Sequence, residues 1–258
     1  MVEGVHFLAT DPPGDVAHKL LAQNLSDLAA KGARPEGVLL NYPLSDPAWD
    51  RAFLDGFARA LTAYATPLIG GDTVSLPLGA PRVLTLIAIG ADAAAPPRSG
   101  ARAGDLLHVT GTIGDAGAGL AIAKGAPGPA ELLAAYRRPV PHLAEGRALA
   151  PLVHAMCDLS DGLLLDAARI AAASGLAVTI ELAQVPLSAA YRAFAGDDPI
   201  AAATAGDDYQ LLFAAPPGLV LPVPTTELGG FRRGAGLSLT HLGKPVPLPA
   251  KLGYLHGS

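Results

Sequence analysis

The chain has 258 residues, of which 50% are hydrophobic and 16% charged, so it has enough apolar side chains for two domain cores. Its net charge of −5 argues against a nucleic-acid partner, because binding to phosphates requires a surplus of lysine and arginine. One cysteine excludes an internal disulfide and fits a reducing cytoplasm. No hydrophobic run approaches the roughly 20 residues that cross a membrane, so we expect no membrane partner.

The first residues have the composition of a strand, because Val2, Val5 and Phe7 are apolar and no turn precedes them. Chain ends are usually polar and frayed, so we expect a further segment upstream of Met1. The stretch has no basic region and no cleavage site, and we therefore do not interpret it as a signal peptide.

Strands and helices alternate over the first 90 residues. Apolar residues at helical spacing predict two helices, at 15–31 with Asp15 as its N-cap, and at 47–64. Apolar runs predict strands at 37–42, 67–73 and 82–90. The last run is apolar on both faces, which favours a central place in its sheet. This half is expected to be an α+β layer of helices on a sheet.

Two acidic residues of this half are candidates for ligand binding. Asp27 interrupts the apolar pattern of the first helix, and Asp72 follows Gly70 and Gly71 at a strand end. Open α/β sheets bind ligands at the carboxyl ends of strands, where glycine allows close approach to the backbone. A solvated helix face and a tight turn would explain the same residues, so both interpretations stay open.

A stretch rich in alanine and proline at 91–99 indicates a domain boundary, which predicts domains at 1–94 and 95–258. Beyond it, a glycine-rich turn at 111–119 links a predicted strand to a predicted helix and could cradle a phosphate. The turn matches neither the P-loop nor the dinucleotide-binding sequence, which removes the two commonest nucleotide-binding folds.

The second half is organised around Cys157-Asp158-Leu159-Ser160-Asp161-Gly162-Leu163. An apolar run at 152–156 predicts a buried strand before it, and helical spacing follows it. Asp158 and Ser160 would point to one side, with Ser160 as N-cap and Asp161 in the first helical turn. Two carboxylates and a hydroxyl suit Mg²⁺ that carries nucleotide phosphates. A helix cap with a spare surface aspartate is the alternative.

Further acidic residues, Asp207 and Asp208, precede an apolar strand. A fold that gathers the strand ends would make a multi-metal site of oxygen ligands from Asp27, Asp72, Asp158, Asp161 and Asp207 or Asp208. Burying so many carboxylates unpaired is costly, so they require cations or solvent. We interpret Cys157 as a small buried residue with a raised thiol pKa, and His6 as either structural or a ligand contact.

Seven stretches together resemble the thiamine-monophosphate kinase family, which belongs to a group of ATP-using enzymes that includes aminoimidazole ribonucleotide synthetase. They occur in the family's order and cover nearly the whole chain. The stretches are VEGVHF at 2–7, NLSDLAAKGA at 24–33, LIGGDT at 68–73, RSGARAGD at 98–105, VTGTIGDAGAGL at 109–120, DLSDGL at 158–163 and AGDDYQLLF at 205–213.

The resemblance implies a kinase of thiamine diphosphate biosynthesis, which uses Mg²⁺ and transfers the γ-phosphoryl group of ATP directly to thiamine monophosphate. It also implies a homodimer and a two-domain α/β fold of mixed sheets covered by helices, with the ATP- and metal-binding half at the N-terminal side. The implied Mg²⁺ ligands are Asp27, Asp72, Asp158 and Asp161, the last two also catalytic. The implied ATP contacts are Gly71, Asp72, Arg98 and Ser160, and the implied substrate contacts are His6, Asp207 and Tyr254.

Two features depart from the family. The family has a Gly-Asp-Asp segment and a Thr-Asp just before VEGVHF, and both supply metal ligands. This chain starts at Met1 and lacks them, so we expect either an upstream start or an impaired enzyme. Asp207 stands where the family usually has glutamate, which is one methylene longer. The alternatives are a catalytically impaired protein that binds nucleotide or thiamine phosphate, and another ATP-dependent member of the superfamily. Selenophosphate synthetase and the hydrogenase-maturation protein would need reactive cysteines that this chain lacks.

Overall fold

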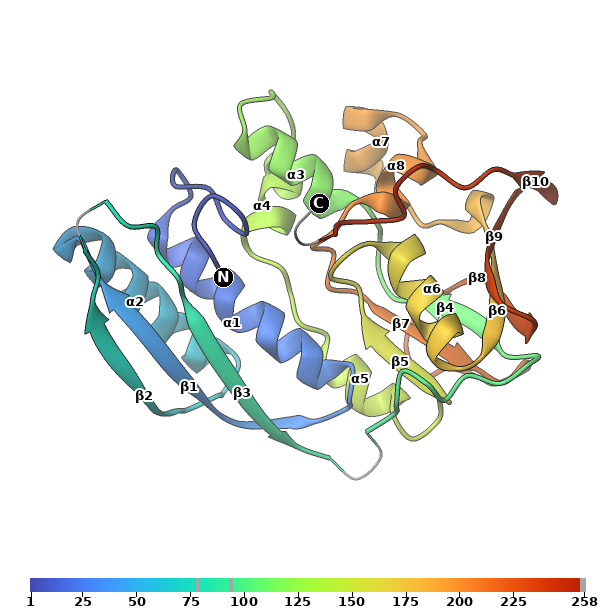
Figure 1. The fold of residues 1–258 in the computed structure, drawn as a ribbon, viewed down its shortest axis with the longest axis horizontal. Helices are drawn as coiled ribbons and strands as arrows, with labels where there is room; N and C mark the ends of the chain where they lie inside the picture. The colour runs from blue at the N-terminus through green and yellow to red at the C-terminus, as the bar shows by residue number, and fades with distance from the viewer. Residues whose placement is uncertain (78, 93–94, 256–258) are drawn as a thin grey trace.

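Two β-sheets of unequal size organise the chain, and helices pack on both of them (Figure 1). The computed structural model describes residues 1–77, 79–92 and 95–255. The predicted fold class, α/β with mixed sheets and helices, is confirmed by parallel and antiparallel pairings in both sheets. The predicted domain boundary falls on residues 93–94, which lie outside the described residues, and it stays a prediction.

The first lobe, residues 1–92, has a three-stranded sheet in the order β2–β1–β3. One face of this sheet is covered by helices, and buried Val38, Leu40 and Tyr42 pack there with Phe53 and Phe57. Alternate residues of β1 point to this face, as a half-buried strand requires. The elements are α1 (Pro13–Ala29), β1 (Arg34–Leu44), α2 (Pro47–Ala63), β2 (Leu68–Ser75) and β3 (Thr85–Ala91).

Three predictions for this lobe were wrong in detail. β3 lies at the edge of its sheet and not in the centre, and its apolar Ile87 and Ile89 point to the uncovered face, where they are about half exposed. The first residues form only isolated bridges, Val2 with Val83 and Glu3 with Phe7. Helix α1 begins before Asp15, because the fixed φ of proline suits the first turn.

The second lobe, residues 95–255, has a seven-stranded sheet in the order β10–β9–β6–β8–β4–β7–β5. Helix α6 packs against its strands, and its leucines Leu163 and Leu164 are fully buried. The strands are β4 (Leu106–Val109), β5 (Ala155–Asp158), β6 (Leu176–Glu181), β7 (Leu211–Ala215), β8 (Thr226–Arg233), β9 (Gly236–His241) and β10 (Lys244–Val246). The helices are α3 (Asp115–Ala123), α4 (Ala130–Arg137), α5 (Leu143–Leu149), α6 (Leu163–Ala173), η1 (Leu182–Gln184), α7 (Ala189–Ala195) and α8 (Pro199–Thr204).

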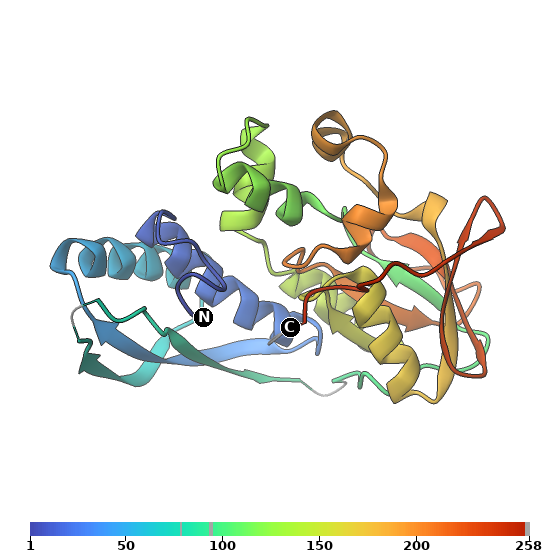
Figure 2. The ribbon, with the colours of Figure 1, turned by 45° about the horizontal axis from the view of Figure 1, so that its top comes forward.

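Helix α1 joins the two lobes, and Figure 2 shows it running from the first towards the second. Its last residues share a hydrophobic cluster with Leu149 of α5 and with Met156 and Phe213 of the second sheet. The approach to α5 is close, because a Cβ on Gly146 would lie 2.0 Å from the carbonyl oxygen of Ala29. The lobes are therefore held together by packing that only glycine permits at this position.

Among the described residues, no helix combines the length and the apolar character needed to span a lipid bilayer.

The contact between α1 and α5 can be tested with Gly146→Ala. The added methyl group overlaps the Ala29 carbonyl, so the helices must separate, and we expect a loss of about 1–3 kcal/mol in the free energy of unfolding. Urea denaturation measures it. Gly14→Ala in α1 is the control, because its Cβ would make ordinary van der Waals contacts, at 3.4 Å with the flexible end of Arg59 and at 3.7 Å with the backbone of Ala52 and Gly56. Equal stability of the two variants would contradict the proposed packing.

Candidate functional site

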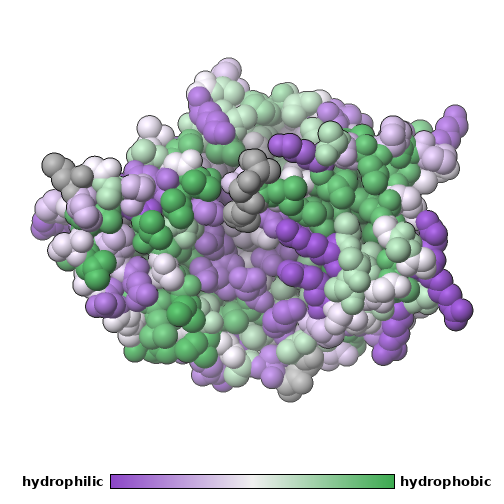
Figure 3. Space-filling model, viewed as in Figure 1, coloured by the Kyte–Doolittle hydropathy of each residue, from purple (hydrophilic) through white to green (hydrophobic). Residues whose placement is uncertain are grey.

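A cleft of about 750 Å³ lies between the two lobes. Its walls come from the loop before α1, from α1 and α3, from the connection between β5 and α6, from residues 204–209 and from the C-terminal tail. In Figure 3 hydrophilic residues occupy the middle of the visible face, between the lobes. Most of the residues predicted to form a site line this cleft, namely His6, Asp27, Asp158, Ser160, Asp161, Asp207 and Tyr254.

The other predicted site residues lie elsewhere. Gly71 and Asp72 are on β2, every residue of which is exposed, and Asp72 accepts a hydrogen bond from the N–H of Thr73 at 2.8 Å. Arg98 does not line the cleft, but its positive charge is near enough to Asp27 to oppose the rise of that residue's pKa. The structure therefore places Arg98 near the acidic residues, and it does not bring Gly71 and Asp72 to the cleft.

Two carboxyl groups face each other at one end of the cleft, the buried Asp158 at the end of β5 and the more accessible Asp27 of α1. Burial, followed by repulsion from Asp27, raises the pKa of Asp158 to about 7. Burial also raises the pKa of Asp27, against the attraction of Arg98 and Lys31. Holding both groups ionised here is costly, so this end of the cleft favours a bound cation.

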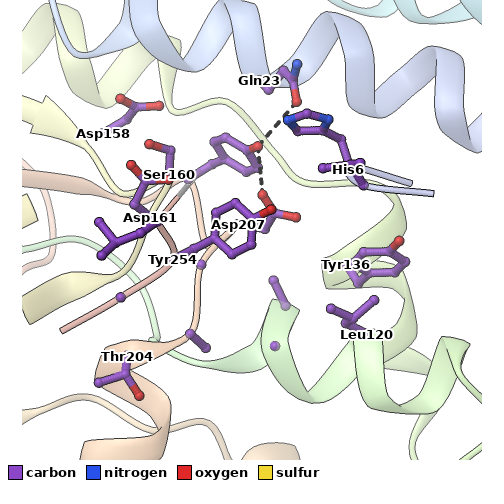
Figure 4. Close-up of a pocket in the computed structure, with 18 of the residues that line it drawn as sticks. His6, Gln23, Leu120, Tyr136, Asp158, Ser160, Asp161, Thr204, Asp207 and Tyr254 are labelled. Atoms are coloured by element: carbon purple, nitrogen blue, oxygen red, sulfur yellow. Dashed lines mark hydrogen bonds between the residues drawn. The ribbon is translucent and has the colours of Figure 1, made fainter. Parts of the chain in front are cut away.

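The connection from β5 to α6 differs from the prediction. Helix α6 begins only at Leu163, and the residue before it, Gly162, has a φ of 118° that turns the chain. Ser160 is therefore not the N-cap, and Asp161 is not in the first helical turn, which instead contains Asp166. Both residues precede the helix and line the cleft, as Figure 4 shows.

Ion pairs and the C-terminal tail hold Asp161 in place. Nη1 of Arg169 lies 2.5 Å from Asp161 Oδ2 and 2.8 Å from Oδ1 of the buried Asp166. The backbone N–H of Tyr254 donates to the Asp161 carbonyl oxygen at 2.8 Å. The tail is thus attached to the same loop that presents the acidic residues.

The donor groups at the acidic end fit Mg²⁺ that arrives with nucleotide phosphates. Carboxylate oxygens are its preferred protein ligands, and it is usually held by one or two carboxylates together with phosphates and water. The hydroxyl of Ser26, the residue before Asp27, is fully buried and lies close enough to the Asp158 carboxyl to oppose the rise of its pKa. Within the part of the chain that the structure describes, no three His, Cys, Asp or Glu side chains form a metal-binding group by themselves.

The other end of the cleft combines aromatic and polar groups. In Figure 4 Asp207 and Tyr254 lie between the acidic end and the side chains of Tyr136 and Leu120. His6 accepts a hydrogen bond from the N–H of Val2 at its Nδ1, 3.0 Å away, which places the ring proton on Nε2. This end can therefore hold a flat ring with polar substituents.

Sequence reasoning missed three residues that organise the site. Lys19 forms a 2.7 Å ion pair with Asp207, the hydroxyl of Tyr209 donates to Asp207 at 3.0 Å, and Arg169 pairs with Asp161. Only Lys19 carried a usable signal, because it is a charged residue among the apolar positions of its helix, directly before Leu20 and Leu21.

The glycine-rich turn before α3 binds a carboxyl group of its own chain. The N–H groups of Gly114 and Ala116 donate to Asp208, at 2.9 and 3.4 Å. These two groups are therefore engaged, and the prediction of a phosphate cradle does not hold for them. Burial is the main reason that the pKa of Asp208 rises to about 8. Cys157 is buried with a raised thiol pKa, also through burial, as predicted.

Comparisons with known proteins identify the family. AIR synthase related protein domains match residues 1–91 (N-terminal domain) and 102–224 (C-terminal domain). The thiamine-monophosphate kinase of Caulobacter vibrioides is 38% identical to this chain, over 100% of the chain and 78% of the relative. That of Escherichia coli K12 is also 38% identical, over 99% and 84%. The chain belongs to the thiamine-monophosphate kinase family.

Solved structures agree with this family assignment. Thiamine monophosphate kinase from Aquifex aeolicus superposes with a TM-score of 0.85 at 30% identity, over 95% of this chain and 87% of that one. AaThiL complexed with AMPPCP and TMP superposes with a TM-score of 0.86 at 31% identity, over 99% and 85%. The hydrogenase maturation protein HypE, at 20% identity and a TM-score of 0.77, shares the fold alone.

The role of Asp208 can be tested with Asp208→Asn, which keeps an oxygen acceptor for both N–H groups. The wild-type carboxyl stays protonated in the native state up to about pH 8 but ionises near 3.8 in the unfolded chain. The free energy of unfolding therefore falls as pH rises through this window in the wild type, and the variant lacks this dependence. We expect the stability of the variant relative to the wild type to increase from about pH 4.5 to about pH 7.5, measured by urea denaturation.

Asp197→Asn is the control for this measurement, because Asp197 is exposed in its pair with Arg192. A constant difference between Asp208→Asn and the wild type at both pH values would contradict a raised pKa of Asp208 in the native state.

Proposed function

We propose that this protein transfers the γ-phosphoryl group of ATP to thiamine monophosphate and forms thiamine diphosphate. The observation that carries the proposal is that one cleft combines an acidic end, with Asp27, Asp158 and Asp161, and an aromatic and polar end, with Tyr136 and Tyr254. The first end suits cation-bound phosphates, and the second suits a flat cationic ring. The activity of the named relatives supports the same assignment.

Mg²⁺ would neutralise phosphate charge at the acidic end, and we propose Asp27, Asp158 and Asp161 as the residues that hold it there. Asp27 and the buried Asp158 repel each other and gain most from a bound cation. Arg169, which also pairs with Asp166, holds Asp161 at the cleft wall, so the Asp161 carboxylate is already oriented before the substrates bind. Phosphoryl transfer of this kind depends on positioning and charge neutralisation rather than on a covalent enzyme intermediate.

The remaining predicted contacts complete this proposal. Ser160 and Arg98 would contact ATP near the acidic end, and Gly71 and Asp72 keep their proposed roles towards ATP and Mg²⁺ although they lie on exposed β2. For thiamine monophosphate we propose contacts with His6, Asp207 and Tyr254 at the other end of the cleft. An ammonium or thiazolium charge is stabilised by a nearby carboxylate and by an aromatic face. A cytoplasmic location, expected from the single cysteine, stays a prediction.

The experiment is turnover of thiamine monophosphate with Mg-ATP, followed by formation of thiamine diphosphate. We expect product from the wild-type chain and a loss of about 100-fold or more in kcat for Asp161→Asn, because a charge next to the transferred group is removed. Asp197→Asn should retain activity, since Asp197 is exposed and lies outside the cleft lining. Binding of both ligands without product would favour the alternative of an impaired binding protein.

We further propose that the protein is a homodimer through the uncovered face of its three-stranded sheet. This face carries exposed apolar side chains from both edge strands, namely Ile69 and Val74 of β2 and Ile87 and Ile89 of β3. Figure 3 shows a hydrophobic area over this sheet at the lower left. A patch of this kind is unusual on a monomer, and a second copy of the same apolar surface can cover it.

The dimer can be tested with Ile69→Glu, because Ile69 is 53% exposed on β2. We expect the wild type to sediment with twice the mass of the chain and the variant to shift towards the monomer, because a charge would be buried in the interface. Val220→Glu is the control, since Val220 is 89% exposed on the other lobe. A monomeric wild type at micromolar concentration would refute the proposed interface.

A further inference from the structure

A buried lysine lies behind the wall of the cleft, between the two lobes. Lys19 of α1 has a side chain only 4% exposed, and its ammonium is 2.7 Å from Oδ2 of Asp207. The same ammonium lies 4.0 Å from the ring centre of Tyr136 in α4. Burial of a lysine ammonium is costly unless an opposite charge or an aromatic ring offsets the loss of hydration. The ion pair with Asp207 and the contact with the Tyr136 ring provide this here.

Asp207 is the member of this group that reaches the cleft. Its side chain is 35% exposed and lines the cleft, whereas Lys19 does not line it. One carboxylate oxygen is held by Lys19, and the other accepts a hydrogen bond from Tyr209 at 3.0 Å. Each oxygen of Asp207 thus has a partner that fixes the direction of the carboxylate.

The backbone around Asp207 makes these partners necessary. Asp207 and Tyr209 both have positive φ angles, 70° and 50°, in a region that residues other than glycine rarely adopt. Such conformations persist only where surrounding contacts hold them, and they cluster at functional sites. Here the contacts are Lys19 on Asp207, the α3 N–H groups on Asp208, and Gln23, which lies 3.3 Å from the hydroxyl of Tyr209.

We infer that Lys19 is a positioning residue for substrate recognition, which acts through Asp207 and holds its carboxylate towards the thiamine part of the substrate. The inference rests on the proposed function. Asp207 lies beside the ring of Tyr254 in Figure 4, and a carboxylate next to an aromatic face suits a cationic heterocycle. The ion pair also joins α1 of the first lobe to the 207–209 segment of the second. The Asp207 carboxylate therefore has a fixed position relative to Asp27, which lies on the same helix as Lys19.

The test is Lys19→Met, which preserves the length of the side chain and removes its charge. The expected result is a rise of about tenfold in KM for thiamine monophosphate, because one charged hydrogen bond to Asp207 is lost. KM for ATP and kcat should change by less than about twofold, since the acidic end of the cleft is formed by other residues. A residue with a merely structural role would lower stability without this separation of the two KM values.

The matched control is Arg138→Met. Arg138, the residue directly after α4, pairs with Asp15 of α1 at 3.5 Å, so this ion pair connects the end of α4 to α1 one turn away from Lys19. Neither residue lines the cleft. Its loss should leave KM for thiamine monophosphate unchanged within about twofold, because an exposed ion pair contributes little.

A double-mutant cycle keeps the inference testable if Lys19→Met folds poorly. Asp207→Asn removes the charge that Lys19 balances, and the combined variant has no unpaired carboxylate at position 207. If Lys19 acts through Asp207, the combined variant should have the same KM for thiamine monophosphate as Asp207→Asn alone. Additive increases would overturn the inference. Lys19→Arg, which retains the charge, should restore part of the affinity.

Binding measurements separate the two proposals. Calorimetric titration with thiamine monophosphate alone should show weaker binding to Lys19→Met than to the wild type, by the same factor of about ten. Equal affinities, with an active wild type, would overturn the role of Lys19 and leave the kinase function intact. A wild type that neither binds nor phosphorylates thiamine monophosphate would overturn the proposed function itself, and the inference with it.

Discussion

The site depends on helix α1, which contacts the core of the first lobe, helix α5 of the second lobe and the cleft at the same time. Leu20, Leu21 and Leu25 are buried in the core of the first lobe, while Ala29 packs against α5 of the second. The remaining face carries Asp27 into the cleft. Because a helix is rigid over this length, the packing of the lobes also fixes the position of Asp27 relative to Asp158.

The four aspartates that line the cleft fall into two pairs, which differ in whether a cation of the chain itself neutralises them. Asp161 and Asp207 are each paired with a cation of the chain itself, Arg169 and Lys19, although Arg169 is shared with Asp166. Asp27 and Asp158 instead raise each other's cost of ionisation, and Asp158 has a pKa of about 7 as a result of burial and this repulsion. An incoming cation therefore gains most at the second pair, and the first pair provides fixed geometry.

Local pattern was sufficient for much of the fold. Helical spacing identified α1 and α2 to within a few residues at each end, because their buried faces repeat along the sequence. It could not place β3, since Ile87 and Ile89 look the same in sequence whether another layer covers them or not. The N-cap at Ser160 was wrong for a related reason, because the sharp turn at Gly162 is decided by backbone geometry.

The family resemblance pointed to most residues of the cleft, including His6, Asp207 and Tyr254, although their separation along the chain hides their proximity. Lys19 and its partner Asp207 are 188 residues apart, and no local pattern connects them. Asp208 shows the same limit, because the N–H of Gly114, which donates a hydrogen bond to its carboxyl group, belongs to a turn 94 residues away. Pairs of this kind become visible only in the folded chain.

The attachment of the tail to the Asp161 loop also determines when the site can form during synthesis. His6 leaves the ribosome well before Tyr254 is added, yet both residues line the same cleft. The first lobe can bury its core while the second is still being made, because domains fold as units from the N-terminal side. A nascent chain therefore acquires stable structure well before it acquires a complete binding site.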